Sequence, residues 1–293
     1  MPLLGLLHGL DLLSTSLLVG AIVFCASILP AGGPAAEKWV HNPNSLISGC
    51  IVFSLILALS WMLCMAVEMS ESWKFDELWG VVSGTRFGFY WAIKIGILVL
   101  IFLVFHFKRF QAISGIAIFL PLFSSLTGHA GAQKLHLFLS LGFDYVHFLA
   151  VSIWTGGLLS LFLTLRRKLS RKDAPLSEAG AVFSLVRRFS HFAMASTALI
   201  AISGLVMAYR YGVILQAPWL TDYGKVLLLK TFFFSLALIA ASINQFVHIR
   251  SWTPEKDQEF TRAIYREVRL EIVFVLVVFI AAGYLTRIAL PID

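Results

Sequence analysis

The sequence has little charge and no signature of an ATP-driven pump. Only 13% of its 293 residues are charged and 59% are hydrophobic, whereas about 25% of the residues in a water-soluble domain are charged. It contains no P-loop and no DKTGT phosphorylation motif, which argues against ATP hydrolysis by this chain. No Lys or Arg precedes the first apolar run. The basic start of a signal peptide is therefore missing, and we expect the run to remain as a membrane span.

Cysteine is also scarce. Cys25, Cys50 and Cys64 lie within or beside apolar runs and form no CxxC pair. A disulfide framework is therefore not expected. Ligation of a soft metal by one of these thiols stays open.

Long apolar runs dominate the chain. Mean hydropathy is +0.85, and a run of about 20 apolar residues is long enough to cross a bilayer. We predict an all-α integral membrane protein with eight transmembrane helices, which places both termini on one side. The predicted spans are residues 4–29, 44–68, 85–107, 111–130, 139–165, 188–211, 221–248 and 269–290.

Loop charge predicts the orientation. The odd-numbered connections carry fifteen Lys and Arg residues and the other face carries six. By the positive-inside rule, the odd-numbered connections are cytoplasmic and both termini are periplasmic. The net charge of +7 is thus explained by topology, and no nucleic-acid partner is expected.

An internal repeat divides the chain into two related halves. TRFGFYWAIK at 85–94 and TDYGKVLLLK at 221–230 share Thr, an aromatic residue, Gly and Lys at the same spacing. Corresponding spans enter the membrane from the same face, so we predict a parallel duplication of two four-helix units. The predicted halves are residues 1–133 and 134–293.

The fifth predicted span contains the densest group of chemically active residues. Asp144, His147 and Trp154 lie close to one stripe of a helix. Gly156 and Gly157 follow about one turn later, where missing side chains let another helix approach closely. Ionisable groups within a span are costly and tend to mark a function.

Three histidines lie at the predicted outer ends of different spans. His8 opens the first span, His129 closes the fourth and His147 lies in the fifth. Their common depth predicts that they meet in one metal site. The simpler interpretation is that they are interfacial residues that never converge.

A methionine stripe lies at the outer end of the second predicted span. In WMLCMAVEM, Met62, Met65 and Met69 share one helix face, with Cys64 and Glu68 beside them. Thioethers favour Cu(I), and imidazole suits copper in either oxidation state. Met65 and Met69 are therefore candidate additions to the histidine site, although such stripes also serve simply as packing material.

The repeat places Lys94 and Lys230 deep in the third and seventh predicted spans. We expect them to pair with carboxylates or to bind anionic groups. The candidate partners are Asp11, Glu68 and Asp144, with Asn244 and Glu271 on the inner side.

Haem is an alternative ligand, because histidines on facing membrane helices hold b-type haems through axial imidazoles. His106, His191 and His248 lie at predicted inner ends, and His191 is the one expected to face inward. A haem b protein of electron transfer or haem metabolism would show a Soret band that a Cu(I) protein lacks.

Several motifs together resemble the copper resistance protein D (CopD) family. They are TGHAG around His129, VHFLAVSIWTGGL in the fifth span, RRFSHFA, ISGLVMA, DYGKVLLLK with Asn244 later in that helix, and RLE with Glu271. The resemblance is strongest over residues 125–290. It implies a bacterial inner-membrane protein of copper resistance or uptake that works beside a small periplasmic copper-binding protein of the copper resistance C type.

The sequence thus predicts a non-enzymatic protein of copper transport or homeostasis in the bacterial inner membrane. The predicted periplasmic copper site, for Cu(I) or Cu(II), consists of His8, His129 and His147 with Met65 or Met69.

Overall fold

The computed structural model is built from helices over the residues that it describes, which are 2–33, 43–107, 110–128, 137–170, 180–213 and 219–288. Seven helical segments of these residues are long and apolar enough to cross a membrane, which agrees with a multi-pass membrane protein. The long helices are α1 (Pro2–Val23), α3 (Pro43–Ser70), α5 (Arg86–His106), α9 (Leu137–Ser170), α10 (Ala181–Arg210), α11 (Asp222–Ile243) and α12 (Asp257–Leu285).

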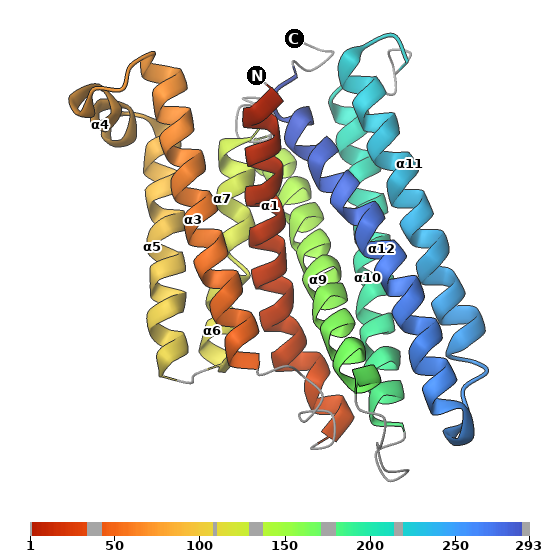
Figure 1. Cartoon of the computed structure of the whole chain (residues 1–293). Helices are drawn as coiled ribbons and strands as arrows, with labels where there is room; N and C mark the ends of the chain where they lie inside the picture. The colour runs from red at the N-terminus through yellow and green to blue at the C-terminus, as the bar shows by residue number, and fades with distance from the viewer. Residues whose placement is uncertain are drawn as a thin grey trace.

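Short elements extend or connect these helices. Helix α4 (Phe75–Gly84) lies at the end of the bundle where α1 begins (Figure 1). Two π-helices, Phe24–Ile28 and Asn244–His248, continue α1 and α11. Two 3₁₀ helices, Leu29–Gly32 and Pro254–Lys256, complete the first segment and precede α12.

The fourth predicted span is not one continuous helix. It consists of α6 (Phe110–Ala117) and α7 (Leu120–Thr127), so the predicted span at 111–130 is interrupted within its described residues. Pro121 explains the break, because proline lacks an amide hydrogen and its ring clashes with the carbonyl four residues earlier, here that of Ala117. The two pieces still follow one another along the bundle (Figure 1).

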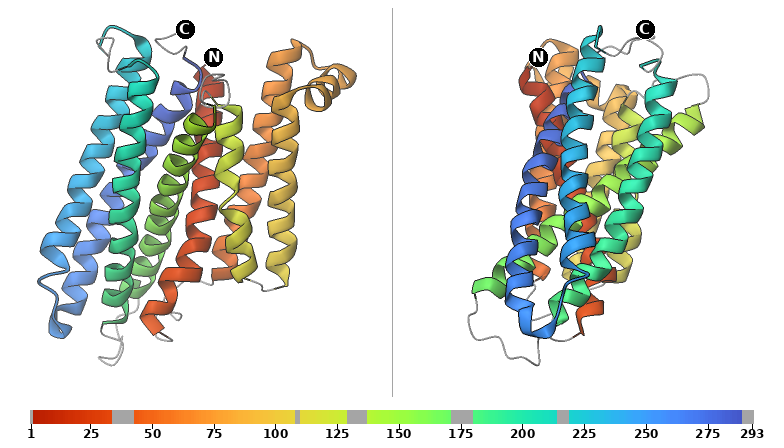
Figure 2. Two further views of the ribbon diagram at one scale, coloured as in Figure 1. Left: turned by 180° about the vertical axis from the view of Figure 1, so that it is seen from behind. Right: turned by 90° about the vertical axis from the view of Figure 1, so that its right-hand side faces the viewer.

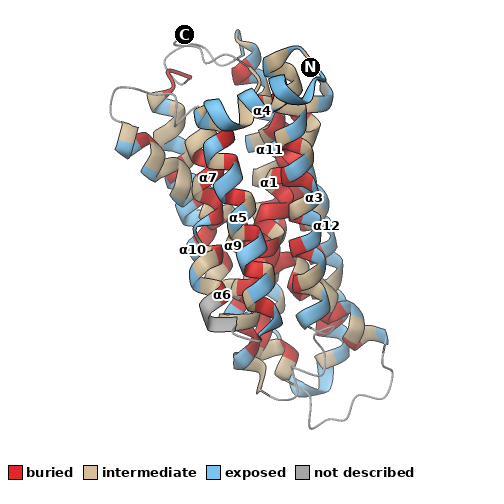
Figure 3. Cartoon of the chain, turned by 90° about the vertical axis from the view of Figure 1, so that its left-hand side faces the viewer, coloured by how far each residue is buried: buried red, intermediate tan, exposed pale blue. Residues whose placement is uncertain are grey.

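Helix α1 lies between two groups of helices (Figures 1 and 2). Its residues Leu18, Val19 and Ile22 belong to a core shared with α3, α5, α6 and α7. Leu13 and Phe24 belong to a second core shared with α9, α10 and α12. Figure 3 shows buried residues inside the bundle and exposed residues on its outer surface. The first helix therefore joins the two groups.

Close backbone contacts fix α1 in this position. A Cβ atom added to Gly20 would lie 2.2 Å from the carbonyl oxygen of Ser152 and 2.6 Å from the Cα of Gly156. One added to Gly9 would lie 2.7 Å from the carbonyl oxygen of Phe279 on α12. The predicted close helix approach at Gly156 is therefore confirmed, and its partner is α1.

The repeated motif forms the same local structure twice. Thr85 is the N-cap of α5, and its hydroxyl accepts a hydrogen bond from the Gly88 amide at 3.0 Å. Thr221 caps α11 in the same way, accepting from the Gly224 amide at 3.0 Å. A Thr N-cap satisfies one of the free amides that begin a helix. Duplication of the complete halves stays a prediction.

Candidate functional site

The candidate site starts from a row of buried polar residues on α1. His8 is 7% exposed and Asp11, Ser14 and Thr15 are 0% exposed. Their spacing of three or four residues keeps neighbouring members on one side of the helix. Buried polar groups are costly unless they form hydrogen bonds or ion pairs. The contacts of these residues therefore indicate their role.

Asp11 forms an ion pair with Lys94 of α5. The Lys94 Nζ atom is 2.7 Å from one carboxylate oxygen and 3.0 Å from the other, and both side chains are fully buried. The predicted pairing of Lys94 with a carboxylate is thus confirmed. Trp91 lies against the pair, with its ring centroid 4.3 Å from Nζ, and its indole nitrogen donates to the Ala58 carbonyl at 2.8 Å.

His8 packs against helix α3. Its ring centroid is 4.5 Å from that of Trp61 on α3. The Nδ1 atom is buried and has no hydrogen-bond partner among the described residues. An imidazole nitrogen in this state is an available metal ligand.

Met65 lies one turn beyond Trp61 on α3. Its sulfur is 3.6 Å from a guanidinium nitrogen of Arg287, which follows the end of α12. Arg287 also forms an ion pair with Glu68, so the local charge is balanced. Met65 and Trp61, the residue against which His8 packs, are thus one turn apart on α3.

Comparison with known proteins agrees with the resemblance seen in the sequence. The family model "Copper resistance protein D-like, N-terminal domain" matches residues 2–135, and the model "Copper resistance protein D" matches residues 183–285. The chain belongs to the copper resistance protein D family. It is 26% identical over 224 residues to the copper transport protein CutJ of Bacillus subtilis (strain 168), a match that covers 71% of this chain and 40% of that protein. The chain thus spans less than half the length of this curated relative. No solved structure matches it.

In this member of the CopD family, His147 lies in the other group of helices. Its Nδ1 atom is 3.0 Å from the hydroxyl of Ser203 on α10. That hydroxyl donates to the Leu199 carbonyl at 2.5 Å, so it accepts from the imidazole. Asp144 interacts by charge with Lys230 on α11. The contacts of His8 and His147 are therefore to different helices.

The remaining predicted ligands are Met69 and His129. The Met69 side chain is 47% exposed on the outer surface of α3. His129 lies outside the described residues. No group of three or more His, Cys, Asp or Glu side chains that could hold a metal ion occurs within the described part of the chain. Convergence of the three histidines stays a prediction.

The inner-end histidines do not form a facing pair. His106 and His191 are exposed, so the expectation that His191 faces inward is wrong. The Nε2 atom of His248 is buried without a hydrogen-bond partner among the described residues.

Sequence reasoning missed a set of buried hydroxyls inside the bundle. Ser16 and Ser152 join α1 to α9, with their hydroxyl oxygens 3.1 Å apart. Other buried hydroxyls on α1, α3, α7 and α9 have no hydrogen-bond partner among the described residues, namely Thr15, Ser54, Ser124, Ser125 and Thr155. The signal was the run STS at 14–16 inside an apolar span. Arg287 was also missed, because it was counted only as a loop charge.

Proposed function

We propose that this CopD-family protein transports copper, or takes part in copper homeostasis, across the bacterial inner membrane through a copper site at its periplasmic face. The role is non-enzymatic, and copper is the cargo. The observation that carries the proposal is the buried Nδ1 atom of His8, which has no hydrogen-bond partner among the described residues and belongs to a ring that packs on Trp61, one turn from Met65. Membership of a copper resistance family supports it.

The proposed ligands are His8, His129, His147, Met65 and Met69. Imidazole and thioether groups suit Cu(I). The contact of His8 with Trp61, one turn from Met65 on α3, supports His8 and Met65 most directly.

A polar interior supports passage inward from this site. The Asp11–Lys94 pair joins α1 to α5 one turn beyond His8, and further buried hydroxyls lie on α1, α3, α7 and α9. Unsatisfied hydroxyls in an apolar bundle favour bound water. We propose that α6 and α7 complete an eighth crossing, so that the chain consists of two four-helix halves.

A separate periplasmic protein of the copper resistance C type is the proposed donor or acceptor of copper. The chain spans 40% of the length of its copper transport relative. The resemblance to the copper resistance protein D family supports this proposal.

Both chain ends are expected to be periplasmic, and residues 166–188 and 250–269 cytoplasmic, because basic residues concentrate in those connections. Alkaline phosphatase fused after the C-terminus should be active, and a green fluorescent protein fused there should stay dark. Fusions within 171–179 should give the reverse pattern. A fluorescent C-terminal fusion would contradict the assigned orientation.

Removing the His8 imidazole is expected to weaken copper binding at least about tenfold, which corresponds to about 1.4 kcal/mol. His8→Phe is the sharper variant, because it keeps an aromatic ring against Trp61 while removing the nitrogens. Met65→Leu should act in the same direction. Cu(I) affinity is measured on purified protein by anaerobic competition with a chromophoric chelator.

His106→Ala is the matched control, since His106 is exposed at the last residue of α5, away from His8. His129→Ala and His147→Ala test the other two proposed imidazoles. Equal Cu(I) affinities for wild type, His8→Phe and His106→Ala would remove His8 from the site.

A further inference from the structure

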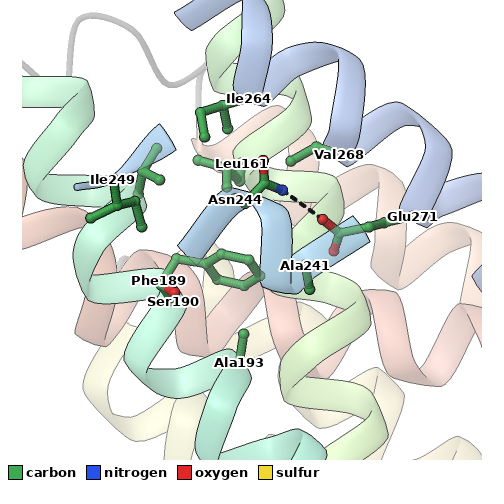
Figure 4. A pocket seen from close by; sticks show the side chains of 11 residues that line it. Leu161, Phe189, Ser190, Ala193, Ala241, Asn244, Ile249, Ile264, Val268 and Glu271 are labelled. Carbon is green, nitrogen blue, oxygen red and sulfur yellow. Dashed lines mark hydrogen bonds between the residues drawn. The ribbon is translucent and has the colours of Figure 1, made fainter. Parts of the chain in front are cut away.

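A small cavity lies between α9, α10, α11 and α12, away from the His8 site (Figure 4). Its volume is about 30 Å³, enough for a water molecule or a small ion. Most of its lining is apolar. The polar residues that line it are Ser190 of α10, Asn244 at the end of α11 and Glu271 of α12.

Glu271 forms no ion pair with any residue in the described part of the chain. Its side chain is 2% exposed, and the Asn244 amide donates to one carboxylate oxygen at 2.8 Å, as Figure 4 shows. None of the ion pairs formed within the described ranges includes Glu271. Arg269, two residues before Glu271, is exposed, and Arg266 pairs with Glu267. An isolated buried carboxylate costs several kcal/mol or more, so Glu271 favours a bound proton or another cation.

The neighbouring Asn244 offers a second oxygen. Its Oδ1 atom is buried and has no hydrogen-bond donor among the described residues. An amide oxygen and a carboxylate in contact therefore line one cavity without enough donors to satisfy them.

Backbone geometry at Asn244 is also unusual. Residues Asn244–His248 form a π-helix, closed by a hydrogen bond of 3.1 Å from the Ile249 amide to the Asn244 carbonyl. Single turns of π-helix inside α-helices are frequent at functional sites. This irregular turn helps to place the Asn244 side chain beside Glu271.

We propose that Glu271 and Asn244 form a binding site for a small hard cation, either a proton or a sodium ion. Carboxylate and amide oxygens suit hard cations, whereas Cu(I) prefers sulfur and imidazole. This site is therefore chemically distinct from the proposed copper site, and the inference does not depend on it. Cation binding would neutralise the carboxylate on α12 and strengthen the packing of α11 against α12.

Among the residues that line the cavity, Glu271 is the one that carries a titratable group. Glu267, one turn earlier on α12, acts on it by charge. Ser190 of α10 lines the cavity, and its hydroxyl donates a hydrogen bond to the side-chain oxygen of Gln245. The apolar side chain of Leu161 lines the cavity from α9.

Infrared difference spectroscopy on the purified, copper-free full chain tests the site. The wild type should show a carboxylic acid C=O band that disappears as pH rises, or carboxylate bands that shift when Na⁺ replaces choline at fixed pH. A response to pH alone assigns a proton, and a response to Na⁺ at fixed pH assigns sodium. Glu271→Gln should abolish the response, and Glu259→Gln, at an exposed position of α12, should keep it.

The proposal is overturned if Glu271→Gln responds like the wild type, or if the wild type responds to neither pH nor Na⁺. Should Glu271→Gln fail to fold, Glu271→Asp keeps the carboxyl group and should move the responsive band rather than remove it. An unchanged band in Glu271→Asp would also overturn the proposal. Because copper is absent from every sample, failure here leaves the copper proposal untouched.

Discussion

Replacing Lys94 with Met should destabilise the folded protein by about 3 to 5 kcal/mol. The substitution leaves the Asp11 carboxylate fully buried without its counter-charge, and it also removes the cation beside the Trp91 ring. Charged groups in a membrane interior have no water to replace a lost partner. Denaturant or thermal unfolding in detergent measures the loss, which should appear as a lower midpoint and a lower yield of monodisperse protein.

Lys225→Met is the matched control on the repeated motif of α11. Lys225 is exposed and pairs only with exposed Asp222 on the same helix, and exposed pairs contribute little. The double variant Asp11→Asn with Lys94→Met should recover part of the lost stability, because it removes both charges. If Lys94→Met unfolds at the same midpoint as Lys225→Met, the buried pair does not hold α1 against α5.

The same substitution tests the functional role of the repeated lysines. If they line or anchor the transport path, Lys94→Met and Lys230→Met should impair copper-dependent growth more than Lys225→Met at matched expression. Equal phenotypes would leave both lysines as structural charges.

Replacing Gly20 with Ala should have the second large effect, a loss of about 1 to 3 kcal/mol from overpacking. The added Cβ would lie 2.2 Å from the Ser152 carbonyl oxygen and 2.6 Å from the Gly156 Cα. Both are backbone atoms, so α1 and α9 must separate. That movement would also disturb the Ser16–Ser152 contact of 3.1 Å. Unfolding in detergent provides the measurement.

Gly96→Ala provides the comparison. Gly96 lies in α5 with open space where its Cβ would stand, and Ala is favoured over Gly in a helix interior by about 1 kcal/mol. This variant should therefore be as stable as the wild type or slightly more stable. A Gly20→Ala protein that matches it would show that α1 and α9 do not pack as closely as the structure has them.

Several features of the site could be anticipated because they depend on local pattern. An apolar run containing His8 and Asp11 predicted functional groups in the first span. The repeated Thr-x-aromatic-Gly motif predicted equivalent helix starts, and both Thr residues are N-caps. Lys94 was expected to meet a carboxylate, since a charge in an apolar helix needs one.

Other features depend on distances between residues far apart in the chain. Three candidate carboxylates were available to Lys94, and the packing of α1 against α5 selected Asp11. Equal depth placed His8 and His147 together in the prediction, which stays a prediction; the structure adds the contacts of His8 with Trp61 and of His147 with Ser203, which depend on the rotation of each helix about its axis.

The sequence by itself determined the membrane class, the approximate spans, the motif repeat and the family resemblance, because hydropathy, charge and helix capping act over short stretches of chain. Only the tertiary structure decided that α1 joins both helix groups, that Pro121 separates α6 from α7, and that Asn244 meets Glu271 beside a cavity. These outcomes follow from helix rotation and close packing. A hydrophobic pattern that is apolar on every side of a helix does not specify which face meets which neighbour.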